Sequence, residues 1–291
     1  GRAMSMDGLQ ERIRKRKCAL ILDLTVLPGA LPKDYGNASF VEGYCAYIRA
    51  LLKRLKGTVP GVRFSVGFFS LLGGEGLSQL PGLTREAGEL GYYVLLETPQ
   101  LNSQALAEFT AQTLLGPESP YHCDGVQIPF YGGSDVLMPF LPYCEKEKKD
   151  VFVCVRTPNR SAPELQDLLT GSRLVHMAAA NRVSRYAQGL QGKYGYARVG
   201  LLASAGAADS LRSLREKYPG LFLLADGLDY PSANLKNVSL AFDKLGRGAA
   251  YCSGEMITLA WRQKPDMDPV EAALAEVRRQ QKGLGRYLTF L

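Results

Sequence analysis

Residues Val151–Leu169 read VFVCVRTPNRSAPELQDLL, and this stretch contains the unit from which the fold is built. Its first part, Val151–Arg156, is an apolar run rich in β-branched residues, which predicts a strand buried on both faces. Its last part, Ala162–Leu169, has the pattern of a helix. A buried strand followed by a helix is typical of a parallel sheet.

The same unit recurs along the whole chain. Seven further apolar runs are expected to be strands: Cys18–Leu24, Val62–Phe69, Tyr92–Glu97, Gly125–Pro129, Val199–Ala203, Leu221–Ala225 and Gly248–Cys252. Helical patterns lie between most of them: Phe40–Leu55, Gly76–Leu90, Ser103–Leu115, Leu174–Gly189, Asp209–Tyr218 and Asn234–Leu245. Eight such units in about 250 residues predict an α/β fold, a single (β/α)₈ TIM barrel. The alternative is a doubly wound open sheet, but the turn after the first expected strand lacks the Gly-rich phosphate-binding pattern common in such sheets.

No linker divides the 291 residues, so residues 6–291 are expected to form one domain. Within it, Met6–Arg16 is expected to be a helix that closes the barrel floor, and Pro269–Lys282 a peripheral C-terminal helix. Residues 1–5, Gly-Arg-Ala-Met-Ser, resemble the remnant of an expression tag and are left out of the fold prediction.

Composition narrows the function classes. No apolar run approaches the roughly 20 residues that a membrane helix needs, so no membrane association is expected. The net charge of +7 is not clustered with aromatic residues, so no nucleic-acid partner is expected. Six scattered cysteines without a CxxC pair favour a reduced, cytoplasmic location and argue against a zinc site. No cofactor is implied.

Four segments, in chain order, resemble orotidine 5′-monophosphate decarboxylases of the longer bacterial subclass. They are Met6–Pro28, Val62–Gly76, Ile128–Leu141 and Val151–Leu169. The last is similar to a family sequence VFVLVRTSNPSSAELQDL, and IPFYGGSDVLMPFL is similar to NPYLGSDSLEPFL. The resemblance covers essentially the whole chain and independently implies a TIM barrel, a carboxy-lyase ancestry and a place in pyrimidine biosynthesis.

The chemistry that the resemblance implies depends on an alternating Asp/Lys network. The family releases CO₂ from a pyrimidine ring and protonates the resulting carbanion, using a lysine of the second strand and a DxKxxD motif after the third. The first-strand aspartate is matched by Asp23. The second-strand lysine is matched by Arg63, which keeps the positive charge but not the geometry or the ready proton exchange.

The DxKxxD motif itself is not matched. Its positions are taken by Glu97, Pro99 and Asn102, with Gln100 as the alternative to Asn102. Pro99, at the lysine position, cannot ionise. No lysine lies between Lys56 and Lys146, so no shift of the alignment restores the proton donor. We therefore expect decarboxylase activity to be lost, and regard no residue as a confident catalytic group.

The phosphate site that the resemblance implies is also altered. The family holds phosphate with a Gly-rich loop after strand seven and an arginine after strand eight. Here the first loop reads ADGLDYPSA, with Asp226 and Asp229, and the second segment reads YCSGEM, with Glu255. Three carboxylates repel a phosphate group, so we expect phosphate binding to be lost.

The candidate ligand-binding residues are Asp23, Arg63, Glu97, Arg156, Thr157, Asn159, Asp226 and Glu255, and Asp229 is expected to lie with the acids at the barrel mouth. They could bind a polar or cationic small molecule, hold a divalent metal ion through carboxylates, or be solvated loop ends that remain after function was lost. Asn159 could contact a base or cap the next helix. Neither His122 nor His176 lies in a recognisable nucleophile motif, so both are expected to be structural.

Three functions stay open. The first is an inactive paralogue that binds a ligand or regulates pyrimidine metabolism. The second is a non-catalytic partner, as a homodimer or a heterodimer with an active paralogue, that pairs through mouth-side loops Leu71–Leu77, Leu101–Leu106 and Phe130–Asp135. The third is an enzyme, either a re-purposed one using Glu97 as a base beside Arg63 or a genuine decarboxylase.

Overall fold

The computed structural model describes residues 5–36 and 39–288. The expected tag remnant therefore lies outside the described residues, apart from Ser5, which precedes the first helix.

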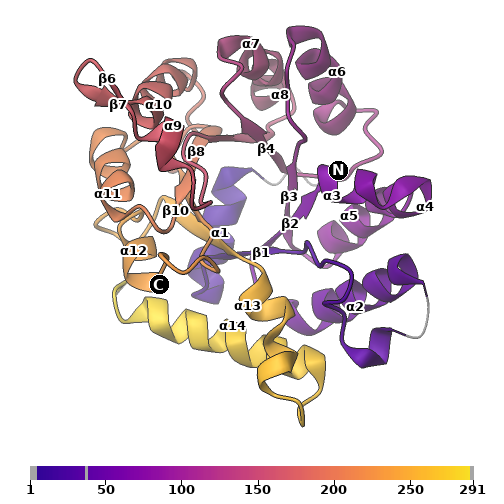
Figure 1. Ribbon diagram of the computed structural model, residues 1–291. Coiled ribbons are helices and arrows are strands. Elements are labelled where there is room, and N and C mark those ends of the chain that lie inside the picture. Colours follow the sequence, from indigo (N-terminus) through magenta and orange to yellow (C-terminus); the bar gives the residue numbers. More distant parts are fainter. Residues whose placement is uncertain (1–4, 37–38, 289–291) are drawn as a thin grey trace.

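Eight parallel strands close into a barrel, and helices surround it (Figure 1). The strands are β1 (Leu20–Asp23), β2 (Gly61–Ser65), β3 (Tyr93–Glu97), β4 (Gly125–Pro129), β5 (Asp150–Cys154), β8 (Val199–Ser204), β9 (Leu223–Asp226) and β10 (Ala249–Ser253). Their order around the barrel is β1-β10-β9-β8-β5-β4-β3-β2. The TIM barrel is thus confirmed, and the open sheet is excluded because β1 pairs with both β2 and β10.

Helices follow the strands around the outside of the barrel. The longer ones are α2 (Phe40–Leu55), α5 (Leu80–Glu89), α6 (Gln104–Leu115), α10 (Val175–Tyr186), α11 (Ala208–Lys217) and α14 (Pro269–Gly285). Short ones are α3 (Val66–Leu71), α4 (Gly73–Leu77), α7 (Ser134–Leu137), α8 (Leu141–Lys146), α9 (Pro163–Gln166), α12 (Leu235–Ser239) and α13 (Glu255–Thr258). Four of the six residues of α3 and the bulk of every strand are apolar, which supplies the barrel core and the layer between strands and helices.

Four expected elements differ in the structure. The helix expected at Gly76–Leu90 is divided between α4 and α5, and the helix expected at Asn234–Leu245 ends at Ser239. The run Val62–Phe69 was expected to be one strand, but the chain turns into α3 at Val66, because the Ser65 Oγ accepts a hydrogen bond from the Phe68 amide over 3.1 Å. The expected helix Ala162–Leu169 ends at Gln166, and Leu169 begins a two-stranded hairpin, β6 (Leu169–Thr170) and β7 (Arg173–Leu174). Gly171, with φ of 65°, provides the left-handed turn residue.

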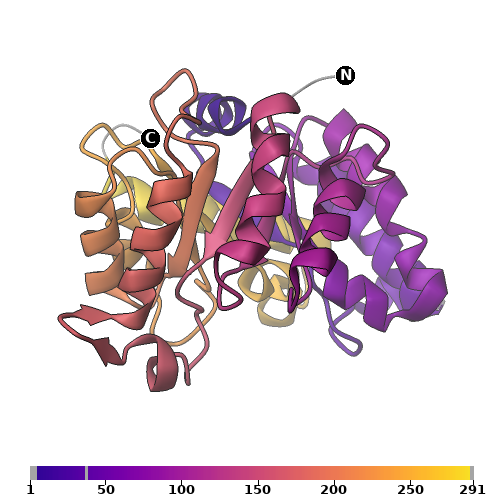
Figure 2. The ribbon, with the colours of Figure 1, turned by 90° about the horizontal axis from the view of Figure 1, so that it is seen from above.

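The first helix, α1 (Met6–Arg16), covers the floor of the barrel, as expected. Three of its side chains bond to the backbone just before three strands. These contacts join Gln10 to Gly248, Arg12 to Gly91 and Arg16 to Val59. Figure 2 shows α1 at one end of the molecule and the β6–β7 hairpin at the other. The opposite end is therefore the mouth, where the strands end.

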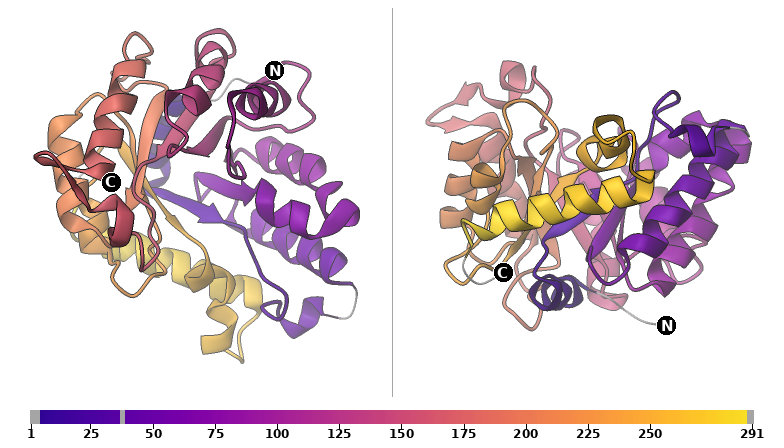
Figure 3. Two further views of the ribbon diagram at one scale, coloured as in Figure 1. Left: turned by 45° about the horizontal axis from the view of Figure 1, so that its top comes forward. Right: turned by 90° about the horizontal axis from the view of Figure 1, so that it is seen from below.

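Helix α14 lies across one side of the barrel (Figure 3), against α2, α12 and α13. Its start is fixed by Asp268, whose carboxylate accepts from the amides of Val270 and Glu271. No helix in the described part of the chain is both long and apolar enough to cross a bilayer. All six cysteines are free thiols.

Candidate ligand site at the barrel mouth

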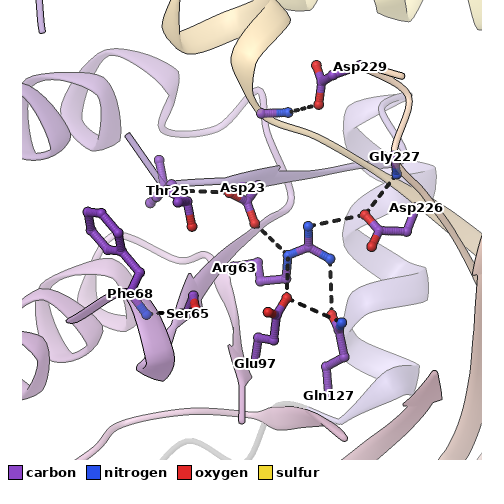
Figure 4. Close-up of polar contacts among 12 residues, drawn as sticks. Asp23, Thr25, Arg63, Ser65, Phe68, Glu97, Gln127, Asp226, Gly227 and Asp229 are labelled. Carbon is purple, nitrogen blue, oxygen red and sulfur yellow. Dashed lines mark hydrogen bonds and ion pairs between the residues drawn. The ribbon is translucent and has the colours of Figure 1, made fainter. Parts of the chain in front are cut away.

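The guanidinium of Arg63 lies at the centre of the barrel mouth (Figure 4). Its Nε donates to Asp23 Oδ2 over 2.7 Å, and its Nη1 donates to Gln127 Oε1 over 3.0 Å. Its Nη2 lies 3.1 Å from Asp226 Oδ1, and Glu97 Oε2 is 4.0 Å from Nε. These five residues, which we call the Arg63 cluster, come from five strands.

The barrel itself brings the Arg63 cluster together. Asp23, Glu97 and Asp226 are the last residues of β1, β3 and β9, and parallel strands end at the same edge. Arg63 and Gln127 each lie two positions before the end of their strand. The register places Asp23 opposite Arg63 and Glu97 opposite Gln127. The structure thus unites four residues that the sequence placed at the mouth.

The Arg63 cluster holds one cation against three carboxylates. Burial of the Arg63 guanidinium works against its charge, but Asp226, Asp23 and Glu97 raise its pKa well above the ordinary value. The pKa of Glu97 is raised as well, which for a carboxyl favours the neutral form. Burial is the main cause, neighbouring Asp23 and Asp226 add to it, and Arg63 opposes it. Arg63 therefore stays charged, whereas Glu97 has a raised affinity for a proton.

The residues at the expected DxKxxD positions lie elsewhere, except Glu97. Pro99, Gln100 and Asn102 are exposed in the loop that follows β3. Thr98 is buried, and its Oγ1 donates to the Gln127 carbonyl over 3.1 Å, which fixes the start of this loop. Among the described residues, the side chains that contact Arg63 are carboxylates and an amide, and none is a lysine.

The segment after β5 forms a second polar group. Arg156 binds both carboxylate oxygens of Asp167, with Nε–Oδ1 and Nη2–Oδ2 distances of 3.0 and 3.1 Å. Thr157 bonds to the Gln166 side chain through its amide and its hydroxyl, and its Oγ1 donates to Asn159 Oδ1. Arg156 is thus directed to Asp167, and the Asn159 side chain bonds to Thr157, while α9 begins without a side-chain cap.

A cavity of about 500 Å³ opens beside this group, between the ends of β5, β8 and β9. Its polar lining comes from Arg156, Asn159, Arg160, Ser204, Tyr230 and Ser232. Gly227 allows the two loops that wall it to approach, because a Cβ there would lie 2.3 Å from Pro158 Cβ. This volume lies within the range of small-molecule sites in proteins.

Asp229 and Glu255 do not join the Arg63 cluster by any bond in the described part of the chain. The Asp229 carboxylate accepts from Ser253 Oγ (3.1 Å), the Gly254 amide (2.8 Å) and the Met256 amide (2.9 Å). It therefore satisfies the backbone donors at the junction of β10 and α13. Glu255 is exposed and lines a different cavity, of about 310 Å³, together with Thr25 and Arg262.

Comparison with known proteins finds relatives that share one name. A protein from Rhodopirellula baltica named orotidine 5′-phosphate decarboxylase is 27% identical over 264 residues, which cover 86% of each chain. One of the same name from Caldicellulosiruptor bescii is 25% identical over 275 residues, covering 88% of this chain and 90% of the relative. Over most of its length, this chain is similar to orotidine 5′-phosphate decarboxylases.

The fold of this chain is shared by a solved structure over its whole length. A crystal structure from Toxoplasma gondii, described as a candidate orotidine-monophosphate decarboxylase, is 21% identical and superposes with a TM-score of 0.81. It covers 98% of this chain and 100% of that one, so the whole barrel is common to both. No family model matches the chain.

Within this barrel, sequence reasoning missed three polar residues. Gln127 bridges Arg63 and Glu97, and the signal for it was a polar residue inside the otherwise apolar strand GVQIP. Asp167 and Ser210 gave no signal. They flank His176, which lies in no recognisable nucleophile motif; its Nε2 is 2.9 Å from Ser210 Oγ and its Nδ1 is 3.0 Å from Asp167 Oδ1. The sequence did not reveal this contact because the three residues are distant in sequence.

Metal ligands are not grouped in the described part of the barrel. Within residues 5–36 and 39–288, no group of three or more His, Cys, Asp and Glu side chains is arranged to hold a metal ion. The carboxylates of the Arg63 cluster are instead directed at the guanidinium.

Proposed function

We propose that this member of the orotidine 5′-phosphate decarboxylase family has lost decarboxylation and binds a small molecule at the barrel mouth. The observation that carries the proposal is the Arg63 cluster. Where the resemblance implies a second-strand lysine, a guanidinium is bound by Asp23, Gln127 and Asp226. A guanidinium remains protonated in proteins and does not exchange a proton with a substrate carbanion.

The loss of the proton donor is supported by the segment after β3. Pro99 stands at the position matched to the motif lysine and has no ionisable group, and the chain has no lysine from residue 57 to residue 145. Decarboxylation requires an acid at a fixed distance from the reacting carbon. Without it, a carbanion would have no partner to protonate it.

The proposed loss of phosphate binding is supported by Asp229. Backbone amides near the end of the last barrel strand could serve as donors to a phosphate, but two of them and the Ser253 hydroxyl already bond to this carboxylate. A dianion there would compete with a fixed internal anion. Asp226 lies on the neighbouring strand, at 3.1 Å from the only cation of the Arg63 cluster.

The ligand class follows from the charges. Three carboxylates face one guanidinium in the Arg63 cluster, so the mouth repels anions and favours an uncharged or cationic ligand. Beside Arg156, which pairs with Asp167, and the exposed Arg160, the neighbouring cavity offers hydroxyls and an amide from Ser204, Ser232 and Asn159 for hydrogen bonds. A polar, non-phosphorylated molecule fits both features.

The test is a decarboxylation assay with orotidine 5′-monophosphate, in which the Rhodopirellula baltica relative is assayed alongside as the positive control. We expect no turnover by this chain under conditions in which the relative turns over. Thermal shifts with orotidine and with its 5′-phosphate then isolate the phosphate. The phosphate should add no stabilisation; turnover, or a larger shift with the phosphate ester, would overturn the proposal.

The second candidate is decarboxylation itself, the activity for which the relatives are named. It is favoured by the raised pKa of Glu97, which makes this carboxyl a candidate to carry a proton beside Arg63. Turnover that is abolished by Glu97→Gln but not by Glu75→Gln, an exposed acid, would assign it. Absence of turnover in both variants and in the wild type would leave the first proposal.

A partner role is compatible with either proposal. Each of the three segments expected to be mouth-side loops, of which Leu71–Leu77 is mostly helix α4, carries a large exposed apolar residue: Leu71, Leu106 and Tyr131, which are 88%, 44% and 55% exposed. Such residues favour pairing with a second copy in the cytoplasm. Leu71→Glu should then lower the mass seen by analytical ultracentrifugation, whereas Leu245→Glu, at a site 57% exposed outside these loops, should not.

A further inference from the structure

Outside the mouth, three side chains form a linked serine, histidine and carboxylate group. The His176 Nε2 lies 2.9 Å from Ser210 Oγ, and the His176 Nδ1 lies 3.0 Å from Asp167 Oδ1 and 2.9 Å from the Gln166 carbonyl oxygen. Both neighbours of Nδ1 are acceptors, so Nδ1 carries the hydrogen in the neutral ring. Nε2 then has a free lone pair that accepts the Ser210 hydroxyl hydrogen, which is the arrangement needed to activate a serine.

The imidazole of His176 is fixed by burial and by contacts at both ring nitrogens. His176 is fully buried on α10, so water does not compete for its ring nitrogens. Asp167 is itself fixed by two bonds from Arg156, at 3.0 and 3.1 Å. The base is thus oriented by a third group that is in turn oriented by a fourth.

Ser210 is only partly buried, and it lies in the first turn of α11. This ten-residue helix has no side-chain cap at its start. The first amides of a helix have no acceptor within the helix, so N–H groups are available close to the serine. They supply the kind of donor that stabilises a developing oxyanion.

We propose that Ser210 is a nucleophile that accepts acyl groups from small activated carboxylic esters, with His176 as its general base and Asp167 as a positioning residue. The Ser210 oxygen bonds to the acyl carbon, and the bond from that carbon to the alcohol oxygen breaks. His176 takes the Ser210 proton at Nε2 and delivers it to the departing alcohol. Water then attacks the acyl serine by the same route and releases the acid. This activity is separate from the Arg63 cluster and does not depend on the function proposed above.

The alternative is a purely structural link between α10 and α11. A covalent probe distinguishes the nucleophile proposal from this structural alternative, because a structural serine does not react with an electrophile. The probe is a fluorophosphonate, which forms a stable bond only with activated serines. Intact mass spectrometry and peptide mapping of the full chain report the number and position of adducts, and hydrolysis of 4-nitrophenyl acetate reports turnover.

The variants are Ser210→Ala, His176→Gln and the control Ser184→Ala. Ser184 lies on α10, and its hydroxyl donates to the Asn181 carbonyl. We expect one adduct on Ser210, no adduct in Ser210→Ala, labelling slowed about 100-fold in His176→Gln, and unchanged labelling in Ser184→Ala. Circular dichroism melts confirm that Ser210→Ala, which removes one oxygen atom, is folded. No adduct on the folded wild type, or an adduct that persists in Ser210→Ala, overturns the proposal.

Discussion

Asp23 and Arg63 lie opposite each other in register on β1 and β2, and Arg63 Nε donates to Asp23 Oδ2 over 2.7 Å. The pair joins two adjacent strands where the barrel opens. Asp226, on β9, forms an ion pair with the same guanidinium from another side. The cation of the mouth therefore pairs with protein groups, and removing it would leave the buried Asp226 and the partly buried Asp23 without their ionic partner.

Replacing Arg63 by methionine should be strongly destabilising. The Arg63 and Asp226 side chains are each 9% exposed, so the change leaves a buried carboxylate uncompensated and should lower the free energy of unfolding at neutral pH by about 3–5 kcal/mol. Urea denaturation measures this. Arg212→Met, which breaks an exposed pair with Asp209, should cost within about 1 kcal/mol. Equal costs for the two variants would show that the Arg63 cluster does not hold the mouth together.

Glu97→Gln should stabilise the protein at neutral pH. The folded-state pKa of Glu97 is raised, so between its unfolded value, about 4.3, and its folded value the folded state holds more protons than the unfolded state. Wild-type stability therefore falls as pH rises through that window. The gain from Glu97→Gln should be present at pH 8 and vanish near pH 3.5. A gain that does not change with pH would contradict the charge argument.

Asp167→Asn should act in the opposite direction. Partial burial works against the Asp167 carboxylate, but Arg156 and His176 outweigh it and lower its pKa below the ordinary value. The unfolded state then binds more protons below about pH 3.9, so this stabilisation is present above that pH and is lost as pH falls. The variant should cost about 1–3 kcal/mol at pH 7. Asp209→Asn is the exposed control, and a matching loss there would refute the assignment.

Asp229→Ala should loosen the junction of β10 and α13. It removes the acceptor for the Gly254 and Met256 amides and should cost about 1–2 kcal/mol, as the loss of a helix cap does. Hydrogen exchange should accelerate at these two amides and stay unchanged on the barrel floor. Asp266→Ala, at an exposed loop position, provides the baseline.

The barrel was predictable because its strands are continuous apolar runs, and such runs indicate strands that are buried on both faces. The boundaries were harder. Val66–Phe69 is apolar enough for a strand, and only the capping bond from Ser65 makes it a helix. Leu169 entered a short hairpin because Gly171 provides the turn, which a helical pattern does not reveal.

The mouth was predictable to the extent that barrel strands end together. Asp23, Glu97 and Asp226 meet there for that reason. What could not be predicted is which acid each arginine binds. Arg156 binds Asp167 through a fold of the chain after β5, and Ser210 meets His176 because α10 and α11 pack side by side. Such contacts depend on side-chain directions that spacing does not encode.

The bond between the Gly248 amide and Gln10 joins residues that are 238 positions apart. Strand β1 likewise completes its hydrogen bonding only when β10 arrives. During synthesis, α1 and the free edge of β1 therefore cannot form these bonds until Gly248 and β10 have left the ribosome. A contact order of this kind slows folding and leaves an exposed strand edge open to aggregation in the meantime. Cooperative folding of this barrel therefore requires β10, and truncation before Ala249 should abolish it.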